Sequence, residues 1–147
     1  MAGHWVLDVG CWMLDVQFSP MTILGTGVDI VETARISSSL ERHGDRFLAR
    51  VFLDGERAYC GKMTNPAPCY AARFAAKEAV SKAFGTGIGA SLGWLDIEVR
   101  RKASGEPFVV LHGEGAKTAT RLGITEIRLS LSHSDHYAVA HALALGA

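Results

Sequence analysis

The run CYAARFAAKEAVSKAF, residues 69–84, constrains the fold of this chain more than any other feature. Six of its residues are alanines, which favour a helix and offer only a methyl group for packing. The run therefore predicts a helix that neighbouring elements can approach closely. Gly85 follows it directly and predicts its end.

The end of the chain offers a surface that fits such a helix. In residues 137–145 every second residue is alanine, at 138, 140, 142 and 144, so one face of the predicted strand carries only methyl groups. We therefore predict an α+β fold in which an antiparallel sheet packs on the long central helix.

The remaining elements follow from the spacing of apolar residues and from glycines. Alternating apolar residues predict strands at 22–32, 94–101, 107–112 and 126–132. Helices are predicted at 33–43, 45–51, 54–62 and 114–122, with Thr33 and Asp54 as caps and with Gly44 and Gly123 as stops.

Length and charge exclude several classes of protein. The 147 residues suit one domain, and no stretch reaches the roughly 18–20 apolar residues that span a bilayer. Fifteen Lys and Arg balance fifteen Asp and Glu, so strong nucleic-acid binding is not expected. Residues 35–82 carry nine basic and five acidic side chains, an excess that can attract an acidic protein or phosphates.

The cysteines and the first residues bear on location. Cys11, Cys60 and Cys69 cannot all pair within the chain and form no CxxC. We therefore expect no disulfide scaffold, and we expect the protein to be in the reducing cytoplasm. Residues 1–20 lack the basic start of a signal peptide. We predict that they are a dispensable extension of a single domain at 21–147.

The central helix carries a carboxylate in an unusual setting. Phe74, Glu78 and Lys82 share one face because they are four residues apart. A Glu–Lys pair at this spacing can be a surface ion pair worth about 0.2–0.5 kcal/mol. However, Glu78 lies in the most apolar helix of the chain, where an idle carboxylate is costly if it is buried.

A second carboxylate, Asp29, shares a strand face with Gly25 and Gly27. The glycines allow something to approach the backbone closely, or they mark a bulged strand beside a crowded neighbour. Asp29 itself can cap a strand end, or it can join Glu78 in holding Mg²⁺, which keeps waters and takes further ligands from substrate phosphates. Lys82 would then neutralise charge on a departing phosphate.

His133 is a further candidate. Its place after two alternating leucines suits either a buried core histidine or a partner for a nucleotide at a strand end. A zinc site is not favoured, because strand alternation separates His136 from His133 and His141. The chain also has no GxSxG elbow and no GxxxxGK[ST] phosphate loop.

Three motifs in order resemble the holo-acyl-carrier-protein synthases, the small bacterial type of 4′-phosphopantetheinyl transferase. They are GTGVDIVETARI at 25–36, YAARFAAKEAVSKAFGTGIG at 70–89 and LSLSHSDHYAVA at 129–140. The resemblance covers about 21–145, and it implies Mg²⁺-dependent transfer of 4′-phosphopantetheine from coenzyme A to a serine of apo-acyl carrier protein. Adenosine 3′,5′-bisphosphate would be released, in support of fatty acid biosynthesis.

The resemblance also implies roles for individual residues. Asp29 and Glu78 occupy the Mg²⁺-ligand positions, and Lys82 occupies that of the lysine near the pyrophosphate. The positions that match coenzyme A contacts are His133, Ser81, Gly85 and Arg73; those that match carrier-protein contacts are Arg35, Arg42 and Arg46. The family forms homotrimers with sites between protomers, and the general base stays open between Glu78 and a metal-bound water.

Two other functions remain in view from the residues. A coenzyme-A-binding or carrier-docking module without catalysis would need no metal-ligand pair, so Asp29 with Glu78 disfavours it. Another Mg²⁺-dependent nucleotide enzyme, such as a pyrophosphohydrolase, would need more acidic ligands than these two.

Overall fold

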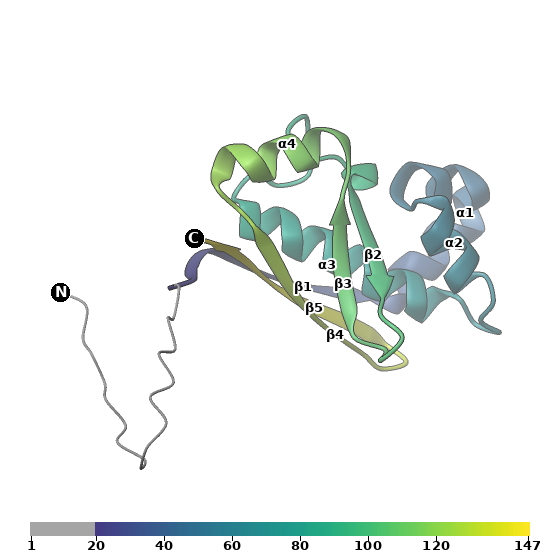
Figure 1. Cartoon of the computed structure of the whole chain (residues 1–147). Coiled ribbons are helices and arrows are strands. Elements are labelled where there is room, and N and C mark those ends of the chain that lie inside the picture. The colour runs from purple at the N-terminus through teal and green to yellow at the C-terminus, as the bar shows by residue number, and fades with distance from the viewer. Residues whose placement is uncertain (1–19) are drawn as a thin grey trace, which may run out of the picture.

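The central sheet has three antiparallel strands in the order β1, β5, β4. In the computed structural model, which describes residues 20–147, these strands are β1 (Thr22–Glu32), β5 (Tyr137–Gly146) and β4 (Glu126–His133). Helix α3 (Ala67–Phe84) lies along one face of this sheet (Figure 1). The predicted α+β fold with a central helix is thus confirmed, whereas the prediction for the first residues falls on 1–19, outside the described part.

Helix α3 approaches β1 so closely that two strand positions have no room for a side chain. A Cβ atom added to Gly25 would lie 1.9 Å from the carbonyl oxygen of Ala83, and one added to Gly27 would lie 1.9 Å from that of Ala79. The element that approaches the glycines is therefore the helix itself. Both interpretations open from the sequence fit the structure: α3 approaches the backbone closely at these glycines, and the register of β1 shifts between Ile23 and Gly25.

The alanine face of β5 packs as predicted. Its four alanines, Ala138, Ala140, Ala142 and Ala144, are at most 1% exposed and form one core with the alanines of α3. The opposite face of the sheet is open and apolar: Ile30 is 65% exposed, and Val28, Val139 and Tyr137 are exposed with it.

Two helices follow β1 and pack beside α3. Helix α1 (Thr33–Val51) is broken at Gly44, which has φ +46°, so it consists of the two predicted pieces. Helix α2 (Asp54–Cys60) follows. The predicted caps are wrong by one residue: Thr33 and Asp54 are the first helical residues, and neither preceding residue caps through its side chain; instead Glu56 Oε2 accepts a hydrogen bond from the Leu53 amide.

A hairpin and a helix complete the chain between α3 and β4. Strands β2 (Ile97–Arg101) and β3 (Pro107–Leu111) form a separate two-stranded sheet, and α4 (Gly113–Leu122) ends at Gly123. The predicted strand at 94–101 begins late, because the 3₁₀ turn η1 (Trp94–Asp96) is held by a hydrogen bond from the Gly93 amide to Asp96.

One cysteine pairing was not anticipated from the sequence. Cys60 and Cys69 form a disulfide with their Cα atoms 5.5 Å apart. Cys60 ends α2 and Cys69 lies in the first turn of α3, so the turn between the helices brings them together. The absence of a CxxC spacing gave no sign of this pairing, because the two cysteines are nine residues apart in the chain.

Candidate active site

Asp29 and Lys82 form the first contact of the candidate site. Lys82 Nζ donates to Oδ1 of Asp29 at 2.9 Å and to the Val28 carbonyl oxygen at 2.9 Å. Asp29 comes from β1 and Lys82 from the last turn of α3. The Lys82 side chain is 50% exposed, so its ammonium group faces a surface that a substrate can reach.

Glu78 lies on α3 one turn before Lys82 and is half-buried. Burial raises the pKa of its carboxyl group above the usual range, the neighbouring Asp29 carboxylate raises it further, and Lys82 partly offsets both effects. Asp29 and Lys82 are in direct contact, and Glu78 lies one helical turn before Lys82, close enough for the Asp29 carboxylate to raise its pKa. The role of these three residues as one site stays a prediction.

The close packing of α3 on β1 explains why this trio converges. Asp29 lies two residues beyond Gly27 on the same strand face, and Gly27 is pressed against Ala79. Because Glu78 precedes Ala79 and Lys82 follows it by three residues, the glycine contact sets the distance between the acidic strand position and the charged helix positions.

The residues present suit one divalent cation. Among residues 20–147 no group of three or more His, Cys, Asp or Glu side chains is placed to hold a metal. Two converging carboxylates fit Mg²⁺ better than zinc, because Mg²⁺ keeps several waters and accepts phosphate oxygens. Burial and the Asp29 carboxylate raise the pKa of Glu78 in the metal-free protein, and a bound cation would oppose both effects.

His133 ends β4 and is exposed, so the interpretation as a buried core histidine is wrong. It pairs with Ala138, which places it on the same face of the sheet as Asp29. Strand β5 lies between them, and two strand spacings alone amount to about 10 Å. Within one protomer His133 therefore does not contact the carboxylate pair.

Three other sequence candidates lie on or after α3. Arg73 is 3% exposed; its guanidinium stacks on the Tyr59 ring at 4.4 Å and donates to Sγ of Cys69, away from the trio. Burial lowers the pKa of Arg73. Ser81 is buried, and its hydroxyl group donates to the Glu78 carbonyl oxygen. Gly85, at φ +73°, ends the helix.

The three arginines that match carrier-protein contacts are exposed on α1. Arg35 lies in the first turn, Arg42 precedes the break at Gly44, and Arg46 follows it. These side chains give the surface of α1 a positive character that an acidic partner can use.

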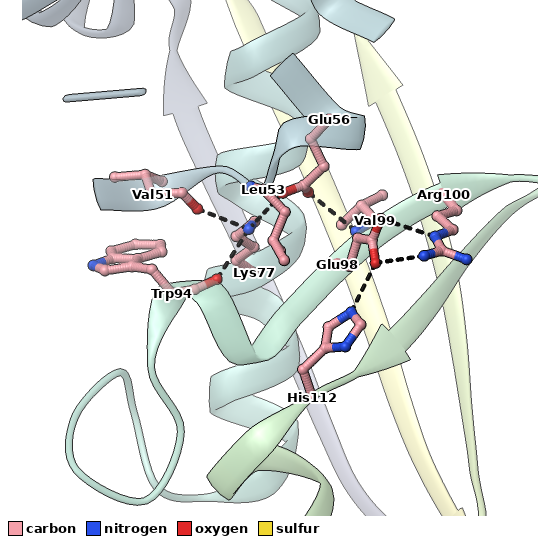
Figure 2. A network of polar contacts seen from close by, with 9 residues as sticks. All are labelled: Val51, Leu53, Glu56, Lys77, Trp94, Glu98, Val99, Arg100 and His112. Atoms are coloured by element: carbon pink, nitrogen blue, oxygen red, sulfur yellow. Dashed lines mark hydrogen bonds and ion pairs between the residues drawn. The ribbon is translucent and has the colours of Figure 1, made fainter. Parts of the chain in front are cut away.

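Lys77 and Glu56 were not predicted from the sequence. Both are fully buried and form an ion pair with Nζ and Oε2 2.8 Å apart (Figure 2). A lysine beside a glutamate on a helix looks like part of a solvated face. The available signal was that alanines occupy the two positions before Lys77 and the position after Glu78 in the same helix.

Comparison with known proteins gives a consistent result. The family described as the 4′-phosphopantetheinyl transferase superfamily matches residues 25–142. A holo-[acyl-carrier-protein] synthase of Koribacter versatilis is 50% identical over 118 residues, which cover 80% of this chain and 94% of that protein.

Two solved structures are similar in fold as well. The holo-[acyl-carrier-protein] synthase of Neisseria meningitidis has a TM-score of 0.79 at 32% identity, covering 84% of this chain and 98% of that one. The Helicobacter pylori synthase, solved in complex with coenzyme A, has a TM-score of 0.73 at 31% identity, covering 81% and 98%.

Proposed function

The chain belongs to the 4′-phosphopantetheinyl transferase superfamily, and on this premise we propose that it transfers 4′-phosphopantetheine from coenzyme A to a serine of apo-acyl carrier protein. The observation that carries the proposal is the convergence of Asp29 and Glu78 with Lys82 beside them. A binding module without catalysis would have no use for this costly pair of carboxylates.

In the proposed reaction, the serine oxygen forms a bond to the phosphorus that bears the pantetheine arm. The bond from this phosphorus to the bridging oxygen breaks, and adenosine 3′,5′-bisphosphate leaves. Asp29 and Glu78 would hold Mg²⁺, which when bound supplies positive charge against the pyrophosphate. Lys82 would compensate negative charge on the leaving phosphate.

The serine must also lose its proton. The two candidates to accept it are the Glu78 carboxylate and a metal-bound water.

The nucleotide contacts call for more than one protomer. His133 and Arg73 match coenzyme A contacts of the family, but in one protomer neither reaches the trio. A homotrimer that buries the open face of the sheet around Ile30 would place sites between protomers and supply the exposed His133 from a neighbour, whereas the buried Arg73 would first have to leave its stack on Tyr59. Light scattering tests this: an active species of one chain, 15.8 kDa, contradicts it.

The carrier protein would dock on α1. Arg35, Arg42 and Arg46 are exposed there, and charge complementarity with an acidic carrier protein would steer the complex. Ser81 and Gly85 would contribute to the coenzyme A site at the end of α3.

We place this activity in the cytoplasm, in fatty acid biosynthesis, and assign it to residues 21–147 as one domain. Within residues 20–147 no helix is long and apolar enough to cross a membrane. In a reducing compartment the Cys60–Cys69 pair is expected to be reduced.

Product analysis tests the proposed reaction. The chain is incubated with coenzyme A, Mg²⁺ and apo-acyl carrier protein, and nucleotides are separated by chromatography. We expect adenosine 3′,5′-bisphosphate to appear in proportion to modified carrier protein and to be absent after chelation of the metal. Nucleotide release without carrier protein would instead indicate a hydrolase.

A further inference from the structure

A buried lysine holds four parts of the fold together next to Glu78. Lys77 Nζ donates to the Val51 carbonyl oxygen at 2.7 Å, to Glu56 Oε2 at 2.8 Å and to the Trp94 carbonyl oxygen at 2.9 Å. These acceptors belong to α1, α2 and η1, whereas Lys77 belongs to α3. Figure 2 shows the three bonds leaving the ammonium group in different directions.

Glu56 completes the arrangement. Its Oε1 accepts from the Val99 amide of β2 at 3.0 Å, and its Oε2 also accepts from the Leu53 amide. Both side chains are 0% exposed, and all three protons of Lys77 and both oxygens of Glu56 have partners. The pair is thus a fixed point to which α3 is tied from several sides.

Stability alone is a weak reason for this pair. Burial lowers the pKa of Lys77 because it penalises the charged form, although Glu56 partly offsets this effect. Apolar residues of similar volume often stabilise a core as well as a buried ion pair does. The pair also provides directional bonds, which apolar side chains do not. Hydrogen bonds from Lys77 to three separate acceptors restrict the rotation of α3 about its axis.

Direction matters for α3 in particular. Seven of its thirteen buried residues are alanines, whose methyl groups interlock little with neighbours. Lys77 and Glu78 are adjacent, about 100° apart around the helix axis, so the orientation of one sets that of the other. A rotation of only about 20° would move a side chain at the helix surface by about 2 Å, as long as an Mg²⁺–oxygen bond.

We propose that Lys77 and Glu56 are positioning residues for the reaction: their buried ion pair fixes the rotation of α3 and so aims Glu78 at the space it shares with Asp29. This inference rests on the proposed function. Neither residue touches substrate in this account; both act through Glu78. The opposite contact, Gly27 against Ala79, fixes the distance of the helix but presents no directional bond.

The test removes both charges together. Lys77→Met with Glu56→Gln leaves no unpaired buried ion, and Glu56→Asp is a milder variant that keeps the charge but shortens the reach. We expect the double variant to need about 10–100-fold more Mg²⁺ for half-maximal transfer, as is typical when the support of a metal ligand is lost. The KM for carrier protein should change less than about twofold. Mn²⁺ binding in the presence of coenzyme A, followed by electron paramagnetic resonance, should weaken by the same factor.

A stability control separates positioning from general damage. Ile97→Ala empties a fully buried site in β2 and should lower the free energy of unfolding by about 2–5 kcal/mol. We expect it to leave Mn²⁺ affinity unchanged, and Glu56→Asp to weaken Mn²⁺ affinity at a cost in stability no greater than that of Ile97→Ala.

Two results would overturn the positioning role. They are wild-type Mn²⁺ affinity in a folded Glu56→Asp or double variant, and equal weakening in Ile97→Ala. If the wild type transfers nothing, the proposed function fails, but the Mn²⁺ titrations still decide the positioning role. If the wild type binds no Mn²⁺, the positioning role is contradicted.

Discussion

Lys82 and Asp29 are 53 positions apart in the chain, yet Nζ of one lies 2.9 Å from Oδ1 of the other. The ammonium group of Lys82 is therefore bonded to the same carboxylate that we propose as a ligand of a divalent cation. A cation bound to this carboxylate would compete with the ammonium group for its negative charge, which would free Lys82 to move toward a substrate phosphate. One side chain therefore neutralises Asp29 before substrate arrives and can serve the leaving group afterwards.

Replacement of Lys82 separates these two roles. In Lys82→Met, Asp29 loses a competing cation, so Mn²⁺ should bind the free protein at least as tightly as it binds the wild type. Without the ammonium group near the pyrophosphate, kcat should fall by about 100-fold or more. Calorimetry and steady-state kinetics measure the two quantities. A parallel loss of Mn²⁺ binding would mean that Lys82 holds the site together.

Glu78→Gln should stabilise the metal-free protein while it inactivates the enzyme. Because the pKa of Glu78 is raised in the folded state, that state binds the proton more tightly than the unfolded chain does. The ionised carboxylate therefore destabilises the fold above its folded pKa, and this cost disappears as the pH falls through that value.

Thermal unfolding in the absence of metal measures this effect. We expect the Tm of Glu78→Gln to exceed that of the wild type by a few degrees at pH 8 and the two to converge near pH 4.5, the ordinary value for glutamate. Added Mg²⁺ with coenzyme A should raise the Tm of the wild type only. A lower Tm for the variant at pH 8 would show that the carboxylate supports the fold.

Gly27→Ala tests the packing that brings β1 to α3. Its Cβ would lie 1.9 Å from the Ala79 carbonyl oxygen, so helix and strand must separate. We expect a loss of about 1–3 kcal/mol or more in the free energy of unfolding, with reduced activity. Gly89→Ala is the matched control, since an added Cβ there meets nothing within 4 Å. Urea denaturation of both variants makes the comparison; equal losses would contradict the packing account.

Arg35→Glu should act on the carrier protein alone. Reversal of one exposed charge on α1 should raise the KM for carrier protein roughly tenfold and leave the KM for coenzyme A nearly unchanged. Added salt should mimic the variant, because screening acts over about 8 Å at physiological ionic strength. Arg121→Glu, at the exposed end of α4, is the control. If Arg35→Glu raised the KM for coenzyme A as much as the KM for carrier protein, the residue would belong to the fold or to the coenzyme A site instead.

Most of the fold could be predicted from local patterns. The alternation of residues 137–145 and the alanines of 69–84 identified the two surfaces that meet in the core, and Gly44, Gly85 and Gly123 marked real breaks, each at positive φ. The glycines of β1 were recognised as a close approach, but a sequence does not say what approaches.

The parts that could not be predicted depend on distant contacts. Glu56 and Lys77 are 21 residues apart and pair only because α2 packs at the side of α3. Cys60 meets Cys69 for a related reason, the turn between these helices. The sequence did not decide whether His133 is buried or exposed. Alternation predicts which face of the strand a residue lies on, but not whether a helix covers the last residue of that face.

The most direct test of the central claim is the intact mass of apo-acyl carrier protein after incubation with this chain, coenzyme A and Mg²⁺. We predict a gain of one phosphopantetheine group on the carrier protein, absent when its acceptor serine is replaced by alanine and at least about 100-fold slower with Asp29→Ala. An unchanged carrier-protein mass with folded wild-type chain, or undiminished transfer by Asp29→Ala at saturating Mg²⁺, would contradict the account.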